Sequence, residues 1–363
     1  MSAADTITLA VAGDFWVNRP LPRDEPRLET VLDRLRAADL SVCVLEMPLS
    51  RRGAPAEKTV RMRAAPERAK DLHHLGVDCV TIANNHMLDY GPDALLDTLE
   101  VLESEGIPFV GAGRNIEEAS RPLVLEAGGI RVAFLACAAT LPLGSAAGED
   151  RPGVNPLHVF TAWVVEPSAR TQEQPGTPPP AMTFASPEDV RALQNAVREA
   201  KSSSDVVVVL PHWGLPNVSA LMDYQRDAGG ALAAAGADLI VGHHAHCIQP
   251  VEMAGNTPVV CGVSNFLFHE LPEGMSRNVY DFMSKDELLV EARLGVDGVR
   301  ELALAPLVLD PSGHPRLAEE KEAARILGEV SDMSAKYGTV IELEGGRGMV
   351  GLGEMVASSM QKE

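Results

Sequence analysis

The 363-residue chain has no apolar run long enough to span a bilayer, and no stretch of it is rich in lysine or arginine. Lys and Arg total 31 against 51 Asp and Glu, and the formal net charge of −20 would repel a phosphate backbone. The first residues also lack the basic and apolar regions of a signal peptide. We therefore expect a cytoplasmic protein that binds neither membranes nor nucleic acid. Nothing in the sequence indicates an oligomeric state.

Cysteine is scarce, and no two cysteines form a CxxC pair. Four of the five lie in apolar runs, which predicts small core residues rather than disulfides or a thiolate zinc site. Only Cys247 stands beside a cluster of histidines. A glycine-rich turn after the first apolar run is also missing, which excludes an NAD-type dinucleotide-binding protein.

The chain does have short apolar runs that alternate with helical patterns, which is typical of an α/β protein. The predicted strands cover residues 7–12, 41–45, 78–83, 109–111, 131–137, 205–210, 239–241 and 259–263. One predicted helix ends near residue 38, and four others cover residues 66–75, 92–105, 186–201 and 219–235. Most strands are apolar throughout, which indicates sheets covered on both faces. Two alternating runs, 287–294 and 299–307, indicate antiparallel pairing.

The regular pattern fails between residues 144 and 187, where Pro, Gln, Thr and Ser are frequent. We interpret this stretch as an inserted loop that is either a lid over the site or a surface excursion without a role. From Arg316 to about Lys336 the spacing predicts an amphipathic helix. The expected organisation is one domain over residues 1–310, followed by a helical extension over residues 311–363 that packs on the body.

Polar side chains interrupt the apolar chain where predicted strands end. Asp14 and Glu46 close the first two strands, and Asn84, Asn85 and His86 follow the third. Two later strands end in histidines: His212, His243, His244 and His246. The carboxyl ends of parallel strands meet at one edge of a sheet, where ligands bind. We therefore expect these side chains to converge.

This mixture of carboxylates, an amide and imidazoles suits one or two ions of Mn²⁺, Fe²⁺ or Zn²⁺. Taken singly, Asp14 is more typical of a turn, and Glu46 is as easily an exposed residue at a helix entry. The run from Gly242 to His246 differs, because three imidazoles would lose hydration for no packing gain unless they bind something. Three further histidines are predicted to be ordinary surface or loop residues: His158, His269 and His314.

Taken together, these residues resemble the CapA family of capsule and poly-γ-glutamate synthesis proteins, distant relatives of the calcineurin-like metallophosphatases. The resemblance covers residues 7–268 and implies a calcineurin-like four-layer αββα sandwich within residues 1–310. It rests on Gly13-Asp14, Leu45-Glu46, Ala83-Asn-Asn-His86 with Asp89-Tyr-Gly91, Pro211-His-Trp-Gly214, Gly242-His-His-Ala-His246 and Ser264-Asn265-Phe266.

The resemblance also implies roles for individual residues. The implied metal ligands are Asp14, Glu46, Asn85, His212, His244 and His246. His86 would protonate the leaving group, and Asp89 would orient it. The implied substrate-binding residues are Asn84, Arg63, Trp213 and His243. Trp16 stands where the phosphatases have a second histidine, so one ligand of the first metal is absent.

The implied function is a metal-dependent hydrolase that acts on a small anionic or γ-glutamyl substrate. It would cleave a phosphoester or a γ-glutamyl amide bond through a metal-activated water. The alternative is a non-catalytic accessory protein that binds an anionic polymer or a synthetase partner. Fold analogy does not choose between them.

Overall fold

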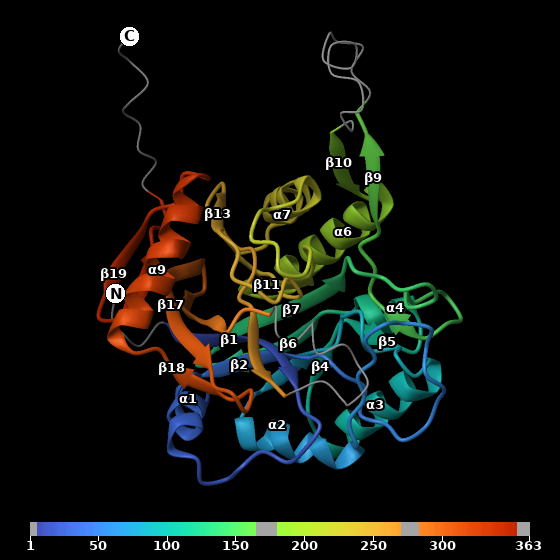
Figure 1. Cartoon of the computed structure of the whole chain (residues 1–363). Coiled ribbons are helices and arrows are strands. Elements are labelled where there is room, and N and C mark those ends of the chain that lie inside the picture. Colours follow the sequence, from blue (N-terminus) through green and yellow to red (C-terminus); the bar gives the residue numbers. More distant parts are fainter. Residues whose placement is uncertain (1–5, 165–179, 270–282, 354–363) are drawn as a thin grey trace, which may run out of the picture.

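Two β-sheets face each other in the computed structural model, and helices cover their outer faces (Figure 1). The structure describes residues 6–164, 180–269 and 283–353. The predicted α/β class is confirmed.

The larger sheet has ten strands, and one half of it is parallel whereas the other half is antiparallel. Its main order is β19 (Ile341–Glu344), β20 (Arg347–Val350), β17 (Gly298–Leu309), β16 (Asp286–Gly295), β1 (Ile7–Trp16), β2 (Leu40–Leu45), β3 (Cys79–Thr81) and β4 (Phe109–Val110). In addition, β15 (Asn265–Phe268) pairs with β1, and β18 (Pro315–Leu317) pairs with β17. The predicted antiparallel pairing of the two alternating runs is confirmed in β16 and β17.

The smaller sheet has six strands and is also parallel at its centre. Its order is β13 (Val251–Ala254), β14 (Thr257–Val260), β12 (Leu239–Val241), β11 (Val206–His212), β7 (Ile130–Ala138) and β6 (Leu123–Ala127). The main helices are α1 (Pro26–Arg36), α2 (Ala69–Leu75), α3 (Pro92–Glu105), α6 (Pro187–Ser203), α7 (Asp223–Ala235) and α9 (Glu320–Ala335).

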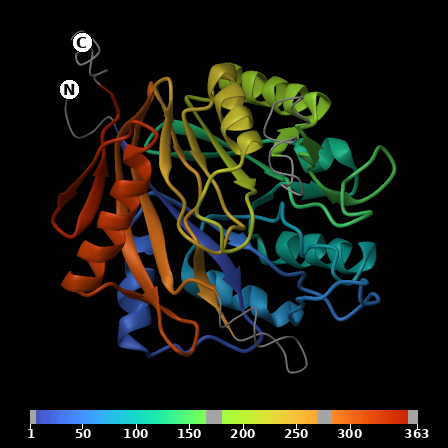
Figure 2. The same ribbon diagram turned by 45° about the horizontal axis from the view of Figure 1, so that its top comes forward.

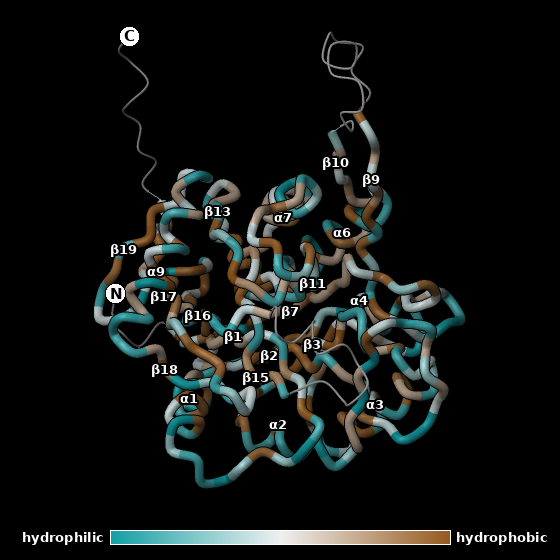
Figure 3. Tube along the Cα trace, viewed as in Figure 1, coloured by the Kyte–Doolittle hydropathy of each residue, from teal (hydrophilic) through white to brown (hydrophobic). Residues whose placement is uncertain are grey.

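Three apolar clusters separate the four layers. Leu9 of the larger sheet and Phe134 of the smaller sheet share a central cluster between the two sheets. Helices α1, α2 and α3 pack against the outer face of the larger sheet, where Leu28 belongs to their cluster. Helices α6 and α7 pack against the outer face of the smaller sheet, where Leu232 belongs to theirs. Figure 2 shows these layers from a second direction, and Figure 3 shows apolar residues along the central strands. The αββα sandwich therefore follows from strands that are apolar on both faces.

The predicted loop over residues 144–187 is wrong in part. Its described residues include β8 (Gly153–Val154) and a hairpin of β9 (Val159–Trp163) and β10 (Ala181–Ala185). The rings of Phe160 and Phe184 lie opposite each other, with centroids 5.6 Å apart, and such cross-strand pairs stabilise hairpins. The hairpin extends away from the body beside α6 (Figure 1). Most of the Pro- and Gln-rich stretch, residues 165–179, lies outside the described residues.

The C-terminal helix is confirmed as α9, but it begins later than predicted because Pro315–Leu317 forms β18. A hairpin of β19 and β20 follows α9 and was not predicted. Strand β20 pairs with β17, so part of the extension completes the larger sheet. The division of the chain at residue 310 stays a prediction.

Candidate metal centre

The carboxyl ends of strands from both sheets meet at one place, as the sequence predicted. Asp14 lies at the register position where β1 pairs with both β2 and β15. Glu46 follows β2, and its backbone N–H donates to the carbonyl of Phe15. His212 ends β11 and forms a parallel bridge with His243, which follows β12. The parallel strands of both sheets thus place their metal-type donor side chains close together.

Three donor atoms lie around the Nε2 atom of His212. This nitrogen lies 2.9 Å from Asn85 Oδ1, 3.1 Å from His244 Nδ1 and 3.6 Å from Glu46 Oε1. Glu46, His212 and His244 form a buried group whose ligand atoms all lie within 4.8 Å of one another. Such separations allow the atoms to bind one ion.

A second group shares Glu46 and adds Asp14 and His246, again with ligand atoms within 4.8 Å. His246 Nε2 lies 3.7 Å from Glu46 Oε1, and His246 Nδ1 lies 2.8 Å from Asn265 Oδ1. A hydrogen bond from the Nδ1–H of His246 to this amide oxygen leaves the Nε2 lone pair free for a metal. Glu46 therefore lies between two donor groups, in the position of a bridging acid.

Several buried polar atoms of this region have no hydrogen-bond partner among the described residues. They are Asp14 Oδ1, both carboxylate oxygens of Glu46 and His212 Nδ1. Asp14 and Glu46 are fully buried, and an unpaired buried carboxylate is costly unless it is protonated or bound to a cation. Oxygen and imidazole donors of this kind suit Mn²⁺, Fe²⁺ or Zn²⁺. The residues therefore fit one or two such ions.

Burial controls the ionisation of these groups. It raises the pKa of Asp14 to about 8, although the backbone N–H of His244 favours the charged form. Burial, reinforced by the charge of Asp14, raises the pKa of Glu46 well above its usual range. Burial lowers the pKa of His246 to about 4 and holds the pKa values of His212 and His244 well below the usual range. The imidazoles are thus neutral near pH 7, which is the form that binds metals.

The backbone around the histidine run is strained. His244 and His246 have φ angles of 82° and 49°, a left-handed region that few non-glycine residues adopt. Gly242 precedes them in a space where a Cβ would lie 2.0 Å from the carbonyl oxygen of Cys261. Only glycine fits there, so the loop can turn sharply between β12 and the centre.

His86 and Asp89 form a buried pair beside the metal ligands. His86 Nδ1 lies 2.5 Å from Asp89 Oδ2, so an Nδ1–H donates to the carboxylate and Nε2 stays free. The same carboxylate accepts the backbone N–H of Met62 and contacts the ammonium group of Lys58. Burial lowers the pKa of His86, whereas Asp89 opposes that shift. Asp89 thus orients a histidine in a water-poor setting.

Two of the four predicted substrate contacts, Asn84 and Trp213, make other interactions. The amide of Asn84 donates to the carbonyl of Leu45, and its Oδ1 accepts the backbone N–H of His86. The buried indole of Trp213 donates to the carbonyl of Cys261. Their predicted contact with substrate stays a prediction.

His243 is buried, and its Nε2 lies 3.2 Å from the carbonyl oxygen of Ala12. Arg63 is partly exposed and lies over the ring of Tyr90, 3.9 Å from its centroid. Their roles in substrate binding also stay predictions.

The structure adds three residues that the sequence analysis assigned no role. Lys58 contacts Asp89 and donates to the carbonyl of Asn85 at 2.7 Å. Asn265 orients His246, although only its motif was recognised. Glu287 is fully buried in β16, and burial raises its pKa well above the usual range. Local sequence offers no clear signal for Glu287, because it stands beside Asp286 at the start of an alternating strand.

Trp16, at the position of the absent histidine, is fully buried and offers no lone pair to a metal. His158 is exposed as predicted, with a side chain 47% exposed. The prediction for His269 and His314 is wrong, because both are buried and their Nε2 atoms lie 3.2 Å apart. Long-range packing of β15 against the turn before β18 buries them, which local sequence does not reveal.

A cavity of about 310 Å³ adjoins the centre. Asn85, Lys58 and Asp89 line it together with residues 142–145, where the insertion begins. The cavity brings a cationic side chain and an exposed apolar residue, Leu143, next to a predicted ligand. A small substrate bound there would lie beside the metal ligands.

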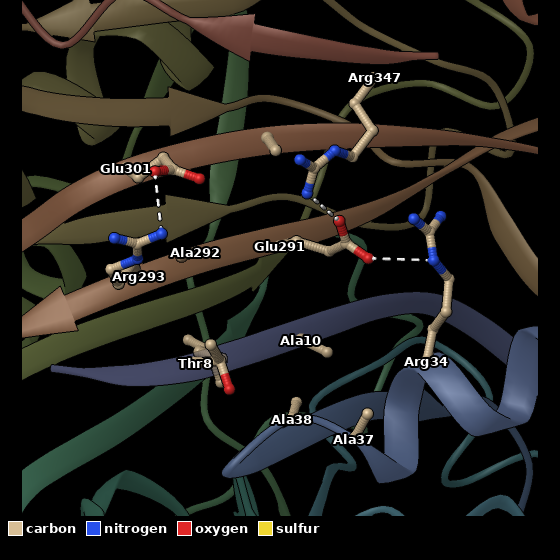
Figure 4. Close-up of a pocket in the computed structure, with 12 residues that line it drawn as sticks. Thr8, Ala10, Arg34, Ala37, Ala38, Glu291, Ala292, Arg293, Glu301 and Arg347 are labelled. Atoms are coloured by element: carbon tan, nitrogen blue, oxygen red, sulfur yellow. Dashed lines mark hydrogen bonds and ion pairs between the residues drawn. The ribbon is translucent and has the colours of Figure 1, made fainter. Parts of the chain in front are cut away.

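Another cavity of about 310 Å³ lies between α1 and the strands β1, β16, β17 and β20 (Figure 4). Glu291 at its centre pairs with Arg34 at 3.5 Å and with Arg347 at 3.4 Å, and Arg293 pairs with Glu301. None of the predicted site residues lines it. This cavity is therefore separate from the metal centre.

The fold and the centre define an α/β protein with a buried, metal-type donor set at the strand ends of facing sheets. All five cysteines are free, and four are buried, as expected. Among the described residues, no helix is long and apolar enough to cross a membrane.

The family described as "Bacterial capsule synthesis protein PGA_cap" matches residues 8–270, and this chain belongs to it. The predicted resemblance to the CapA family is thereby confirmed.

Three relatives show how far the similarity extends. An uncharacterized protein of Sinorhizobium fredii is 26% identical over 97% of this chain and 94% of its own length. The PGA biosynthesis protein CapA of Bacillus subtilis is 26% identical over 84% of this chain and 72% of its own. A Mycobacterium tuberculosis protein, named as a probable polyglutamine synthesis accessory protein, is 29% identical over 62% of this chain and 54% of its own.

Proposed function

We propose that this protein is a metal-dependent hydrolase whose centre is formed by Asp14, Glu46, Asn85, His212, His244 and His246. The observation that carries the proposal is the fully buried Glu46, whose carboxylate has no hydrogen-bond partner in the part of the chain that the structure describes and is shared by two groups of metal-type donors. An ionised carboxylate in that setting is costly unless a cation binds to it. When bound, the metal would supply an activated water and polarise the substrate oxygen.

The chain's own residues would handle the proton and the substrate. Asp89 at Nδ1 favours the imidazolium form of His86, and in that form Nε2–H can give its proton to the leaving group. Lys58, bound to Asp89 and to the carbonyl of Asn85, adds positive charge at the rim of the adjoining cavity. That charge favours an anionic substrate.

The substrate class is a small anionic phosphoester or a γ-glutamyl amide. The metal-type centre supports phosphoester cleavage, whereas the resemblance to poly-γ-glutamate synthesis proteins, with a PGA biosynthesis protein among the relatives, supports a γ-glutamyl substrate. Both bonds would place a negative oxygen beside the cavity wall formed by Lys58 and Asn85.

Metal content and hydrolysis, measured on the same preparations, test the proposal. Protein purified without chelator is analysed for Mn, Fe and Zn and assayed with p-nitrophenyl phosphate, bis(p-nitrophenyl) phosphate and γ-glutamyl-p-nitroanilide. We expect His244→Ala to lose metal and turnover together. His86→Gln should keep its metal but lose about 10²-fold or more in kcat. His158→Gln, at an exposed histidine, is the matched control and should change neither.

The alternative is an accessory protein that binds an anionic polymer or a synthetase partner without hydrolysis. Two observations favour it: Trp16 stands in place of a metal ligand, and the name of the Mycobacterium relative calls it an accessory protein. Metal-free protein that hydrolyses none of the three substrates, before or after loading with Mn²⁺ or Zn²⁺, would overturn the hydrolase and support this role.

A further inference from the structure

A second cluster of metal-type donors lies apart from the centre, where the turn before β18 meets the start of α1. Glu25 immediately precedes α1, and Asp310 and His314 flank the tight turn between β17 and β18. Figure 1 shows β18 beside α1. The ligand atoms of Glu25, Asp310 and His314 lie within 4.8 Å of one another.

The turn holds Asp310 and His314 side by side. Asp310 Oδ1 accepts the backbone N–H groups of Ser312 at 2.7 Å and of His314 at 3.0 Å. The backbone N–H of Asp310 donates to the carbonyl of His314 at 2.9 Å. These bonds use one oxygen of Asp310 and leave the other available. Glu25 Oε2 lies 2.9 Å from His314 Nδ1, a hydrogen-bond distance in the metal-free protein that already places the two groups next to each other.

Behind this cluster, His314 is held by a chain of hydrogen bonds. His314 Nε2 lies 3.2 Å from His269 Nε2. His269 Nδ1 in turn lies 3.3 Å from the backbone nitrogen of Asn18 and 3.2 Å from its side-chain oxygen. Both histidines are buried, so every proton in the chain needs a partner.

Asn18 can complete this row of hydrogen bonds whichever way the two histidines donate. If His314 Nδ1–H donates to Glu25, then His269 donates to His314 and accepts the backbone N–H of Asn18. If a cation occupies His314 Nδ1, then His314 Nε2–H donates to His269, and His269 Nδ1–H donates to the side-chain oxygen of Asn18. A metal-binding histidine that gives its other N–H to a fixed acceptor is the usual support of a metal site.

We infer that Glu25, Asp310 and His314 form a second site for a divalent cation such as Mn²⁺ or Zn²⁺, supported by His269 and Asn18. One imidazole and two carboxylates suit these ions, and water completes the coordination on the partly exposed side. The site links α1 to the β17–β18 turn. Arg19 donates to the carbonyl of Ser312 in the same turn, so its charge makes the site weaker than the main centre.

Mn²⁺ binding to the full chain tests the inference independently of hydrolysis. A variant with the main centre removed, His244→Ala with His246→Ala, is freed of metal and titrated with Mn²⁺ while EPR counts the free ion. We expect one bound equivalent to remain. Adding Asp310→Asn should weaken that binding at least about tenfold, although the asparagine oxygen still accepts both backbone N–H groups.

Two further variants complete the test. Glu25→Gln should weaken Mn²⁺ binding as Asp310→Asn does, whereas Asp297→Asn removes an exposed acid elsewhere and should leave it unchanged. Circular dichroism checks that each variant is folded. The inference is overturned if the parent variant binds neither Mn²⁺ nor Zn²⁺ at millimolar concentration. It is equally overturned if Asp310→Asn and Glu25→Gln, both folded, bind Mn²⁺ like their parent.

Discussion

Asp14→Asn should stabilise the metal-free protein, even though it removes a predicted metal ligand. In the folded metal-free chain, burial raises the pKa of Asp14 from 3.8 to about 8. The unfolded chain loses this proton near pH 4. Between pH 4 and pH 8 Asp14 is therefore protonated more often in the folded state than in the unfolded state, and its own contribution to stability falls as pH rises. Asparagine carries no charge and can still accept the backbone N–H of His244.

The size of the effect follows from the change in pKa. Each pKa unit corresponds to about 1.4 kcal/mol, so a rise of about four units gives an upper bound of about 5 kcal/mol at pH 8. At pH 6 the expected gain is about half as large, and near pH 4 it vanishes.

Urea unfolding in the presence of EDTA, followed by tryptophan fluorescence at several pH values, measures this gain. With Mn²⁺ in place of EDTA the order should reverse, because only the wild-type protein gains stability from the bound ion. A gain below about 1 kcal/mol at pH 8 in EDTA, or a gain that does not grow between pH 5 and pH 8, would refute the assignment of Asp14 as a buried, uncompensated carboxylate.

Three other outcomes are expected. Gly242→Ala should lower the free energy of unfolding by about 2 kcal/mol or more, because its Cβ would meet the carbonyl of Cys261 and the indole of Trp213. An unchanged urea midpoint would contradict this packing. Lys58→Met should raise KM for an anionic substrate more than it lowers kcat, since Lys58 lies at the rim of the cavity; steady-state kinetics with a neutral substrate as control would show whether charge is responsible. In EDTA, wild-type stability should also fall as pH drops from 6.5 towards 4. Burial lowers the pKa of His243 and His246 to about 4, so the two imidazoles bind protons in the unfolded chain at a higher pH than in the folded protein. Thermal unfolding that is independent of pH in this range would argue against neutral histidines.

Much of the centre was predictable because its residues follow apolar strands. Glu46 and His212 stand directly after or at the end of strands that are apolar on both faces, and such strands are recognisable from composition alone. Parallel strands then bring their carboxyl ends to one edge. Short-range sequence thus contains enough information to predict the α/β class and a set of candidate donors, whereas the αββα layering was implied by the resemblance to the CapA family.

Other features depend on contacts that short-range sequence does not encode. The hairpins β9–β10 and β19–β20 were missed because few residues define each strand, and their pairing partners decide them. His269 and His314 looked like ordinary loop histidines, yet β15 and the β17–β18 turn bring them together in the interior.

By itself, the sequence determined which residues could bind a cation. Residue type sets the donor atoms, and the recognisable apolar strands show which donors stand at strand ends. Only the tertiary structure decided how those donors are grouped. It placed Glu46 between two groups, turned His246 Nε2 towards the centre through Asn265, and set Glu25, Asp310 and His314 apart as a second cluster. The physical reason is that ligand geometry depends on distances between residues far apart in the chain, and packing of two sheets fixes those distances.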